Sequence, residues 1–246
     1  MENKAMRHIR NSVLSLLLLI AMLMTYVGAG DRVVSAPALH GPLVGHVIAI
    51  DPGHGGYDGG ARSQSGKWEK TYNLSISQKL RGYLQSLGAI VVMTRDGDYA
   101  LCDINPPIRK KRQDMERRAE VVLNANADLL VSIHMNQYRD SRQSGPQVFF
   151  RADCEASRKL SETLQAEMIE QLSPKYKREA HAGDFYMLSL GIPSALVECG
   201  FLSNTAEEAL LRTETYEEQI AKAIGDGIVE WYALSTRPVA AEREER

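Results

Sequence analysis

The sequence is poor in cysteine, and this shortage excludes two kinds of stabilised protein. Three cysteines occur in 246 residues, Cys102, Cys154 and Cys199. Their number is odd and their spacing shows no pairs, whereas a disulfide framework or a thiolate zinc site calls for paired cysteines. We therefore expect three small, partly buried side chains at these positions.

The chain also lacks an excess of positive charge. It has 29 lysines and arginines against 31 aspartates and glutamates, which gives a formal net charge of -2. A nucleic-acid-binding domain calls for a strongly basic face, so no nucleic-acid partner is predicted. Two basic clusters, residues 109–112 and 175–178, are interpreted as the solvated sides of a helix or loop.

One segment is apolar enough to act in a membrane. Residues 11–30 carry no charged side chain and follow Lys4, Arg7 and Arg10. A basic stretch before an apolar run is typical of a secretory signal. The length of the run is also close to the number of apolar residues that cross a bilayer as a helix, about 20, so an uncleaved membrane anchor is also an open alternative. We predict that residues 1–30 are a signal peptide or N-terminal membrane anchor and that the protein is exported.

The rest of the chain is predicted to contain a linker at 31–45, one catalytic domain at 46–234 and a charged tail at 235–246. The central part has the size of one domain with a proper core. Its apolar pattern predicts strands at 46–50, 90–94, 129–133, 146–150 and 194–197, with 146–150 as an outer strand. Helical spacing predicts helices around 70–87, 115–126, 160–172 and 216–231. Alternating strands and helices indicate a layered α/β domain with a mainly parallel sheet.

Three of these strands end in polar residues that could form a site. His54 follows the first strand in Asp51-Pro52-Gly53-His54-Gly55-Gly56, His134 follows the third, and Glu198 follows the last. Loops at the carboxyl ends of parallel strands form the sites of such sheets, so we expect these side chains to converge. The glycine-rich loop lacks the Gly-Lys-Ser/Thr of a P-loop and the third glycine of a dinucleotide fingerprint. Its predicted role is to bend the backbone and present His54.

Two histidines and one carboxylate are an ordinary ligand set for catalytic zinc, which keeps a position open for water or substrate. Glu69 is the natural third ligand, because it lies at the start of the next helix and could reach back over the loop that carries His54. His181, in a polar loop before residues 185–188, is a weaker candidate for contact with substrate.

Four segments together resemble the zinc-dependent N-acetylmuramoyl-L-alanine amidases of the amidase-3 type. In order, they are Asp51-Pro52-Gly53-His54-Gly55-Gly56, Trp68-Glu69-Lys70, Ser132-Ile133-His134-Met135-Asn136 and Val197-Glu198-Cys199-Gly200-Phe201-Leu202-Ser203-Asn204. The resemblance spans about 46–231. It implies a mixed, mainly parallel twisted sheet of about six strands, flanked by helices in a single zinc-hydrolase domain.

The resemblance also implies roles for individual residues. It makes His54, Glu69 and His134 the ligands of a Zn²⁺ cofactor and Glu198 the catalytic carboxylate. Asn136, two residues past a ligand, could support the metal site or touch the substrate. Arg95 and Arg118 also resemble family positions, and we expect them to support the fold.

The implied reaction is hydrolysis of the amide bond between the lactyl group of N-acetylmuramic acid and L-alanine in peptidoglycan. A short form with a leader and one catalytic domain most resembles the germination-specific amidases of endospore-forming bacteria. This implies a role in spore cortex maturation, with formation of muramic-δ-lactam, and a polysaccharide deacetylase acting on the same glycan. The expected location is the cell wall or the forespore intermembrane space.

Other functions stay open at this point. A zinc peptidase or carboxypeptidase acting on wall peptides can use the same residue types, but its first histidine and glutamate are separated by about two residues, and here fourteen residues intervene. A general vegetative wall amidase, or autolysin, would share every motif. A glycosidase could use Glu69 and Glu198 as its two carboxylates, and a non-catalytic wall-binding module would be expected to have lost a ligand or the base.

Overall fold

The structure is a computed structural model that describes residues 40–103 and 110–235. The predicted leader, most of the linker and nearly all of the charged tail lie outside the described residues. Within these two ranges, no helix combines the length and the hydropathy that a bilayer span requires.

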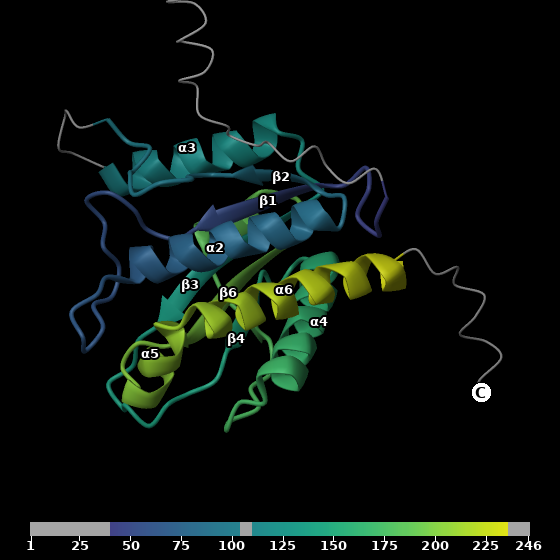
Figure 1. The fold of residues 1–246 in the computed structure, drawn as a ribbon. Coiled ribbons are helices and arrows are strands. Elements are labelled where there is room, and N and C mark those ends of the chain that lie inside the picture. Colours follow the sequence, from purple (N-terminus) through teal and green to yellow (C-terminus); the bar gives the residue numbers. More distant parts are fainter. Residues whose placement is uncertain (1–39, 104–109, 236–246) are drawn as a thin grey trace, which may run out of the picture. The chain divides into compact units, whose positions relative to one another are not determined.

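Six strands form one mixed sheet in the order β2-β1-β3-β6-β4-β5 (Figure 1). Their bounds are β1 Val47–Pro52, β2 Ile90–Met93, β3 Leu129–Asn136, β4 Gln147–Phe150, β5 His181–Ala182 and β6 Ser194–Phe201. Strands β2, β1, β3 and β6 are mutually parallel. Strand β4 runs antiparallel to β6, and β5 is parallel to β4. The prediction of a mixed, mainly parallel sheet of about six strands is therefore confirmed.

The prediction that 146–150 is an outer strand is wrong. Strand β5 pairs with β4 through Phe149 opposite His181 and Phe150 opposite Ala182, so β5 forms the edge. Both residues of β5 are exposed. A two-residue exposed strand carries no hydrophobic alternation, and its sequence is that of a polar loop.

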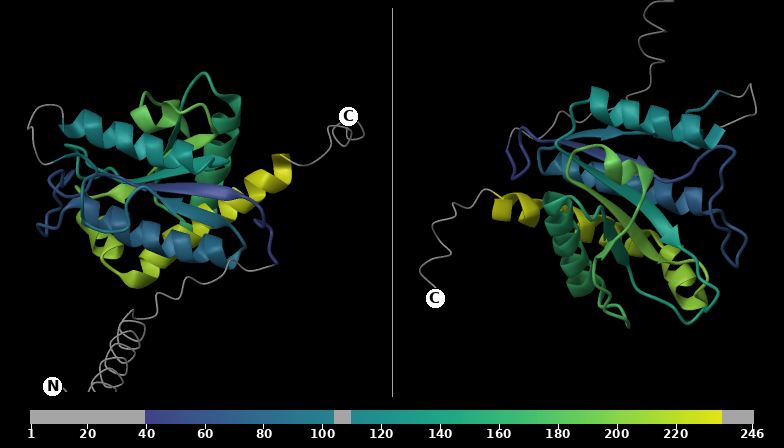
Figure 2. Two further views of the ribbon diagram at one scale, coloured as in Figure 1. Left: turned by 90° about the horizontal axis from the view of Figure 1, so that it is seen from above. Right: turned by 180° about the vertical axis from the view of Figure 1, so that it is seen from behind.

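The helices cover both faces of the sheet, and Figure 2 shows α3 separated from α2 and α6 by the strands. Their bounds are α2 Glu69–Ser86, α3 Lys110–Asn124, α4 Glu155–Leu172, α5 Thr205–Leu211 and α6 Glu214–Ser235, with a short 3-10 helix η1 at Tyr186–Ser189. Four of these match the predicted helices, whereas α5 and η1 were not predicted.

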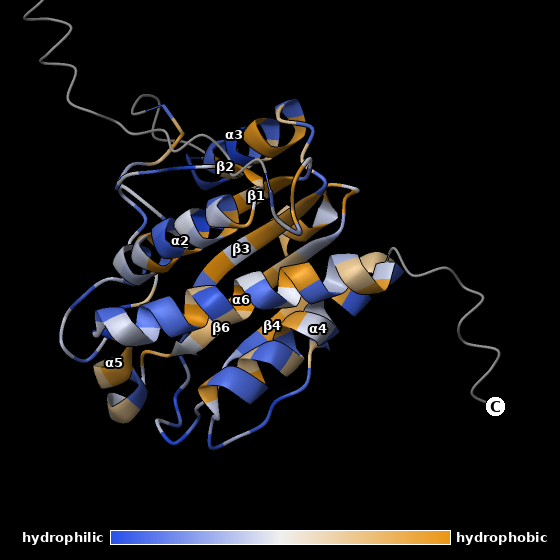
Figure 3. Ribbon diagram, turned by 45° about the vertical axis from the view of Figure 1, so that its right-hand side comes forward, coloured by the Kyte–Doolittle hydropathy of each residue, from blue (hydrophilic) through white to orange (hydrophobic). Residues whose placement is uncertain are grey.

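Side-chain alternation along the strands separates two layers of the core. Ile48 and Ile50 of β1 join a large cluster with apolar residues of α2, α4 and α6. Ala49, between them, joins a smaller cluster with Val122 of α3 and Met187 of η1. Because both faces of the parallel strands are covered, β1, β3 and β6 are apolar along most of their length (Figure 3).

The three cysteines agree with their predicted role. None forms a disulfide; Cys102 and Cys154 are partly buried, and Cys199, in β6, is fully buried in the core.

Candidate metal and catalytic site

The loop after β1 brings His54 close to His134. Gly53 leaves no room for a side chain, because a Cβ atom there would collide with the imidazole ring of His134. His54 itself has a positive φ of 61°, a conformation that non-glycine residues seldom adopt. The rings of His54 and His134 meet edge to face, with centroids 5.0 Å apart. The backbone of the loop therefore sets the relative position of the two imidazoles.

Two buried arginines hold this loop in place. Arg95 donates hydrogen bonds to the carbonyl oxygens of Pro52 and Gly53, each at 2.9 Å. Arg118, on α3, donates to the carbonyls of Pro52 at 2.8 Å and His54 at 2.5 Å. Buried carbonyls need such partners, so the arginines stabilise the strained turn. This is the supporting role that the sequence predicted for them.

Helix α2 is joined to the same loop at its first residues. The backbone N–H of Glu69 donates to the carbonyl of Ala61 at 2.8 Å, and that of Lys70 donates to the carbonyl of Gly59 at 3.1 Å. The first N–H groups of a helix have no acceptor within the helix, and here loop carbonyls supply one. Lys70 also donates through Nζ to the carbonyl of Gly56 at 2.7 Å. Glu69 is thereby fixed beside the loop that carries His54.

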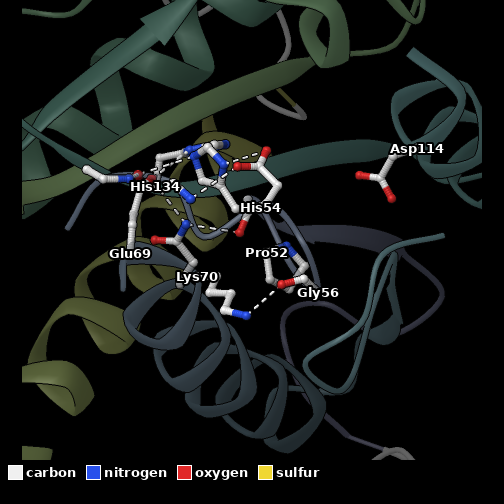
Figure 4. A network of polar contacts seen from close by, with 12 residues as sticks. Pro52, His54, Gly56, Glu69, Lys70, Asp114 and His134 are labelled. Atoms are coloured by element: carbon white, nitrogen blue, oxygen red, sulfur yellow. Dashed lines mark hydrogen bonds and ion pairs between the residues drawn. The ribbon is translucent and has the colours of Figure 1, made fainter. Parts of the chain in front are cut away.

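The three predicted ligands converge. Glu69 Oε2 lies 3.2 Å from Nε2 of His54, and Glu69 Oε1 lies 3.1 Å from Nδ1 of His134. One ligand atom from each residue falls within 4.8 Å of the others. Figure 4 shows the two rings and the carboxylate pointing toward one another from the loop, α2 and β3.

This donor set fits a zinc ion by its chemistry and its spacing. Ligand distances of about 2.0–2.2 Å in a tetrahedral site place neighbouring ligand atoms about 3.3–3.6 Å apart, slightly more than the separations of 3.1 and 3.2 Å seen here. The carboxylate is also fixed by its surroundings, since Ala61 N–H donates to Oε2 at 2.8 Å and Met135 N–H to Oε1 at 3.2 Å.

The charges of these groups agree with a site for a cation. Burial opposes ionisation of Glu69, but the hydrogen bonds from His134 and His54 outweigh it and lower the pKa of Glu69. Burial likewise opposes protonation of His54, and the carboxylates of Asp58 and Glu69 overcome it and raise the pKa of His54 to about 9. A metal ion and the imidazole proton therefore compete for the same histidine.

Glu198 lies directly beside the candidate ligands. It stands opposite His134 in the register of β6 and β3. Burial raises the pKa of Glu198 to about 7; the charge of His134 opposes this shift and that of Glu69 adds to it. Its Oε2 atom is buried and has no hydrogen-bond partner among the described residues. Glu198, His54 and His134 line one cavity of about 390 Å³, bordered also by residues of α3 and η1.

The weaker sequence candidates lie elsewhere. Asn136 makes no side-chain hydrogen bond to the candidate ligands in the part of the chain that the structure describes, and it lines a different cavity. His181 lies in β5 at the exposed sheet edge. Asp58 was missed: its carboxylate lies 2.9 Å from Nδ1 of His54. Its position four residues past the histidine, within the glycine-rich loop, was the available signal.

A His-Glu-His set next to a partly buried carboxylate, at the carboxyl ends of the parallel strands, is the arrangement of a metal-dependent hydrolase. The family model that matches residues 48–230 is that of the N-acetylmuramoyl-L-alanine amidases, Amidase_3. The chain belongs to this family of metal-dependent enzymes, which hydrolyse an amide of peptidoglycan.

Individual relatives agree with the family. The germination-specific N-acetylmuramoyl-L-alanine amidase of Bacillus subtilis is 36% identical over 203 residues, which cover 80% of this chain and 84% of the relative. The CwlD amidase of Clostridioides difficile, solved in complex with the GerS lipoprotein, is 38% identical with a TM-score of 0.74 and covers 77% of this chain and 99% of that one. The amidase LytC of Bacillus subtilis is 32% identical, but the chain spans only 38% of its length.

Proposed function

We propose that this protein is a zinc-dependent N-acetylmuramoyl-L-alanine amidase that acts on spore cortex and supports the formation of muramic-δ-lactam. The observation that carries the proposal is the convergence of His54, Glu69 and His134 beside Glu198, whose buried Oε2 atom has no hydrogen-bond partner in the described part of the chain. The bond cut would be the amide between the lactyl carboxyl of N-acetylmuramic acid and L-alanine.

Zinc, when bound, supplies a Lewis acid for the carbonyl and lowers the pKa of a bound water to about 7. His54, Glu69 and His134 would hold it, and their backbone supports keep the three groups in position. Glu198 would accept the proton of the attacking water and pass it to the departing alanine nitrogen. Its partly buried position, opposite His134, raises its pKa to about 7 and suits a carboxylate that must bind and release a proton near neutral pH.

Cortex is favoured over vegetative wall by the extent of the similarity. The germination-specific relative is matched over 84% of its length and the CwlD amidase over 99%. The wall amidase LytC is less similar, with 32% identity, and the match covers 38% of its length. The similarity to the germination-specific relative therefore supports a cortex role over that of a general autolysin.

The proposed location is outside the cytoplasm, in the cell wall or forespore intermembrane space, with residues 1–30 as the export signal or membrane attachment. A polysaccharide deacetylase would act on the same glycan, since formation of a lactam on a muramic residue requires both loss of the stem peptide and a free amine. A lipoprotein partner is a further possibility to test by co-purification, given the complex in which the CwlD amidase was solved.

The test is digestion of purified cortex and of vegetative peptidoglycan, with and without a chelator, followed by mass spectrometry of the fragments. We expect free stem peptides beginning with L-alanine, released faster from cortex and only while metal is present. Zinc added after chelation should restore the release.

The other outcomes identify the alternatives. Shortened stems still attached to glycan would indicate a carboxypeptidase. Cut glycan with intact stems, unaffected by chelator, would indicate a glycosidase. Equal release from both walls would contradict the cortex assignment while leaving the amidase activity in place.

A further inference from the structure

A second cavity lies beside the candidate catalytic carboxylate. It has a volume of about 300 Å³ and is lined by Asn136, Tyr138, Gln143, Gln147, Arg178 and Phe201. These residues come from the ends of β3 and β6, from the start of β4 and from the two segments that flank β4 and α4. None of the six is a candidate metal ligand or proton acceptor, and Asn136 is the residue that the sequence predicted to support the metal site or touch the substrate.

The strand register places this cavity next to Glu198. Gln147 of β4 stands directly opposite Glu198 of β6 in an antiparallel pair, and such opposed residues have Cβ atoms about 4.5–5.5 Å apart. On the other side of β6, an irregularity of the β3 pairing shifts the register, so that Asn136 stands opposite Phe201. The cavity therefore lies at the same edge of the sheet as His134 and Glu198, next to the candidate metal site.

Arg178 is held in this cavity in one orientation. Its Nε donates to the carbonyl of Ser144 at 2.9 Å, and its Nη2 donates to Oε1 of Gln143 at 2.7 Å. Its Nη1 makes a longer contact of 3.4 Å with Oε1 of Gln147. The guanidinium also lies over the ring of Phe201, 4.8 Å from the centroid. An arginine fixed in this way loses little side-chain entropy when it binds a ligand.

The charge of Arg178 is not neutralised by an ion pair within the described residues. Its hydrogen-bond acceptors are all neutral, whereas Arg118 pairs with Asp51 and Asp114, and Arg142 with Asp140. Burial raises the pKa of the nearby Glu207, and the positive charge of Arg178 partly opposes this shift. That carboxylate accepts its hydrogen bonds from the backbone N–H groups of Gly145 and Phe201.

This environment corrects the sequence interpretation of residues 175–178 as a solvated basic cluster. Arg178 is half-buried, whereas residues 175–177 are exposed. A fixed, half-buried guanidinium with neutral partners and an adjoining cavity is suited to bind an anion, and its planar fork suits a carboxylate.

We propose that Arg178 binds a carboxylate of the stem peptide, and so selects acidic stems and aligns the scissile amide with Glu198. The inference rests on the proposed function, because it assigns the leaving peptide to the side of Glu198 that faces β4. Arg178 then acts as a specificity residue, and Asn136 and Tyr138 provide further polar contacts along the same cavity.

The experiment compares two soluble muropeptide substrates that differ only in whether the stem carboxylates are free or amidated. The full-length wild type is compared with Arg178→Gln and Arg178→Lys. The control is Arg142→Gln, which removes an exposed arginine paired with Asp140 near the same segment. We expect Arg178→Gln to lower kcat/KM about 10–100-fold on the free-carboxylate substrate, mainly through KM, and to change the amidated substrate little.

Arg178→Lys should fall between the wild type and Arg178→Gln, because it keeps the charge and loses the fork. The Arg142→Gln control should match the wild type on both substrates. Equal losses on the two substrates in Arg178→Gln would show that Arg178 only supports the structure and would overturn the inference.

Two further readouts keep the test decisive. The melting temperature and bound zinc show whether Arg178→Gln folds. If it does not fold, the test is the kcat/KM of the wild type, which should be higher on the free-carboxylate substrate than on the amidated one. A wild type that cleaves both substrates equally contradicts the role of Arg178. A wild type that cleaves neither contradicts the proposed function itself.

Discussion

Glu198 is partly buried beside two histidines, and no hydrogen bond within the described residues satisfies its buried Oε2 atom. A buried carboxylate oxygen without a partner costs free energy, which is consistent with a group that binds next to it during the proposed reaction. We predict that Glu198→Gln, which keeps the shape and removes the proton acceptor, retains bound zinc. Turnover should fall on the order of 10²–10⁴-fold, the usual contribution of a general base. Zinc content by mass spectrometry and kcat on a soluble muropeptide measure the two effects.

The matched variant is His134→Ala, which removes a candidate ligand opposite Glu198. It should lose zinc and turnover together, whereas Glu198→Gln separates them. A Glu198→Gln protein that releases stem peptides at the wild-type rate would show that the proton acceptor lies elsewhere.

At the scale of an element, the loop after β1 and the first turn of α2 act as one unit. Gly60 has a positive φ of 68°, and a Cβ atom there would lie 2.5 Å from Oε2 of Glu69 and 2.7 Å from Cδ2 of His54. Gly60→Ala should therefore displace two candidate ligands without exposing the core. We expect at least about a tenfold loss of zinc affinity, comparable to the loss of a supporting contact. Competition with a zinc chelator of known affinity measures it.

The control for this prediction is Gly82→Ala, within helix α2 and away from the loop. A Cβ atom at Gly82 meets nothing within 4 Å, and alanine is favoured over glycine inside a helix by roughly 0.5–1 kcal/mol. Gly82→Ala should thus leave zinc affinity unchanged and raise the melting temperature slightly. Equal zinc affinity in Gly60→Ala and the wild type would mean that the loop relaxes around the added methyl group.

Elements with a strong pattern could be predicted from the sequence, and elements formed by pairing could not. The buried runs that became β1, β3 and β6 have a continuous apolar character, and the long amphipathic helices repeat every three to four residues. Strand β3 nevertheless continues to Asn136 and β6 to Phe201, beyond their predicted ends. The two strands stay hydrogen-bonded to each other through His134 opposite Glu198 and Asn136 opposite Phe201, after their apolar residues end. Strand β5 exists only through its contact with β4.

The candidate site likewise contains residues whose placement could be predicted from the sequence and residues whose placement could not. The convergence of His54, His134 and Glu198 could be predicted, because His54 follows β1 and the other two lie near the carboxyl ends of β3 and β6, in one parallel set. The setting of Arg178 could not, since its partners Gln143, Ser144 and Gln147 lie more than thirty positions away along the chain. A run of basic residues such as 175–178 is predicted to be solvated, because the sequence does not show that the fold brings distant acceptors to Arg178.

At the scale of the whole molecule, a buried ion pair ties the sheet to α3 beneath the site. The carboxylate of Asp51 accepts hydrogen bonds from Arg118 at 2.8 Å, Thr94 at 2.6 Å and Ser132 at 2.8 Å. Burial would raise the pKa of Asp51, but the charge of Arg118 and these hydrogen bonds outweigh it and lower the pKa below its ordinary value of 3.8. Asp51 of β1 is thereby connected to Ser132 of β3, to Thr94 directly after β2 and to Arg118 of α3.

This arrangement makes the free energy of unfolding depend on pH in a defined direction. Because the pKa of Asp51 is lower in the folded protein than in the unfolded chain, the unfolded chain takes up the proton first as the pH falls. The stabilisation is therefore complete well above pH 3.8 and is lost as the pH falls below that value. Asp51→Asn should cost about 1.5–3 kcal/mol at pH 7, the range for losing a hydrogen bond to a charged group, because Arg118 keeps its pair with Asp114. The difference from the wild type should shrink below pH 3.8.

Urea unfolding of the purified protein at a series of pH values from 7 to about 3 measures this difference. The control is Glu116→Gln, which breaks the solvent-exposed pair with Arg112. Exposed pairs contribute little, so this variant should follow the wild type at every pH. A constant difference between Asp51→Asn and the wild type down to pH 3 would mean that Asp51 stabilises the fold by its shape and hydrogen bonds rather than by its charge.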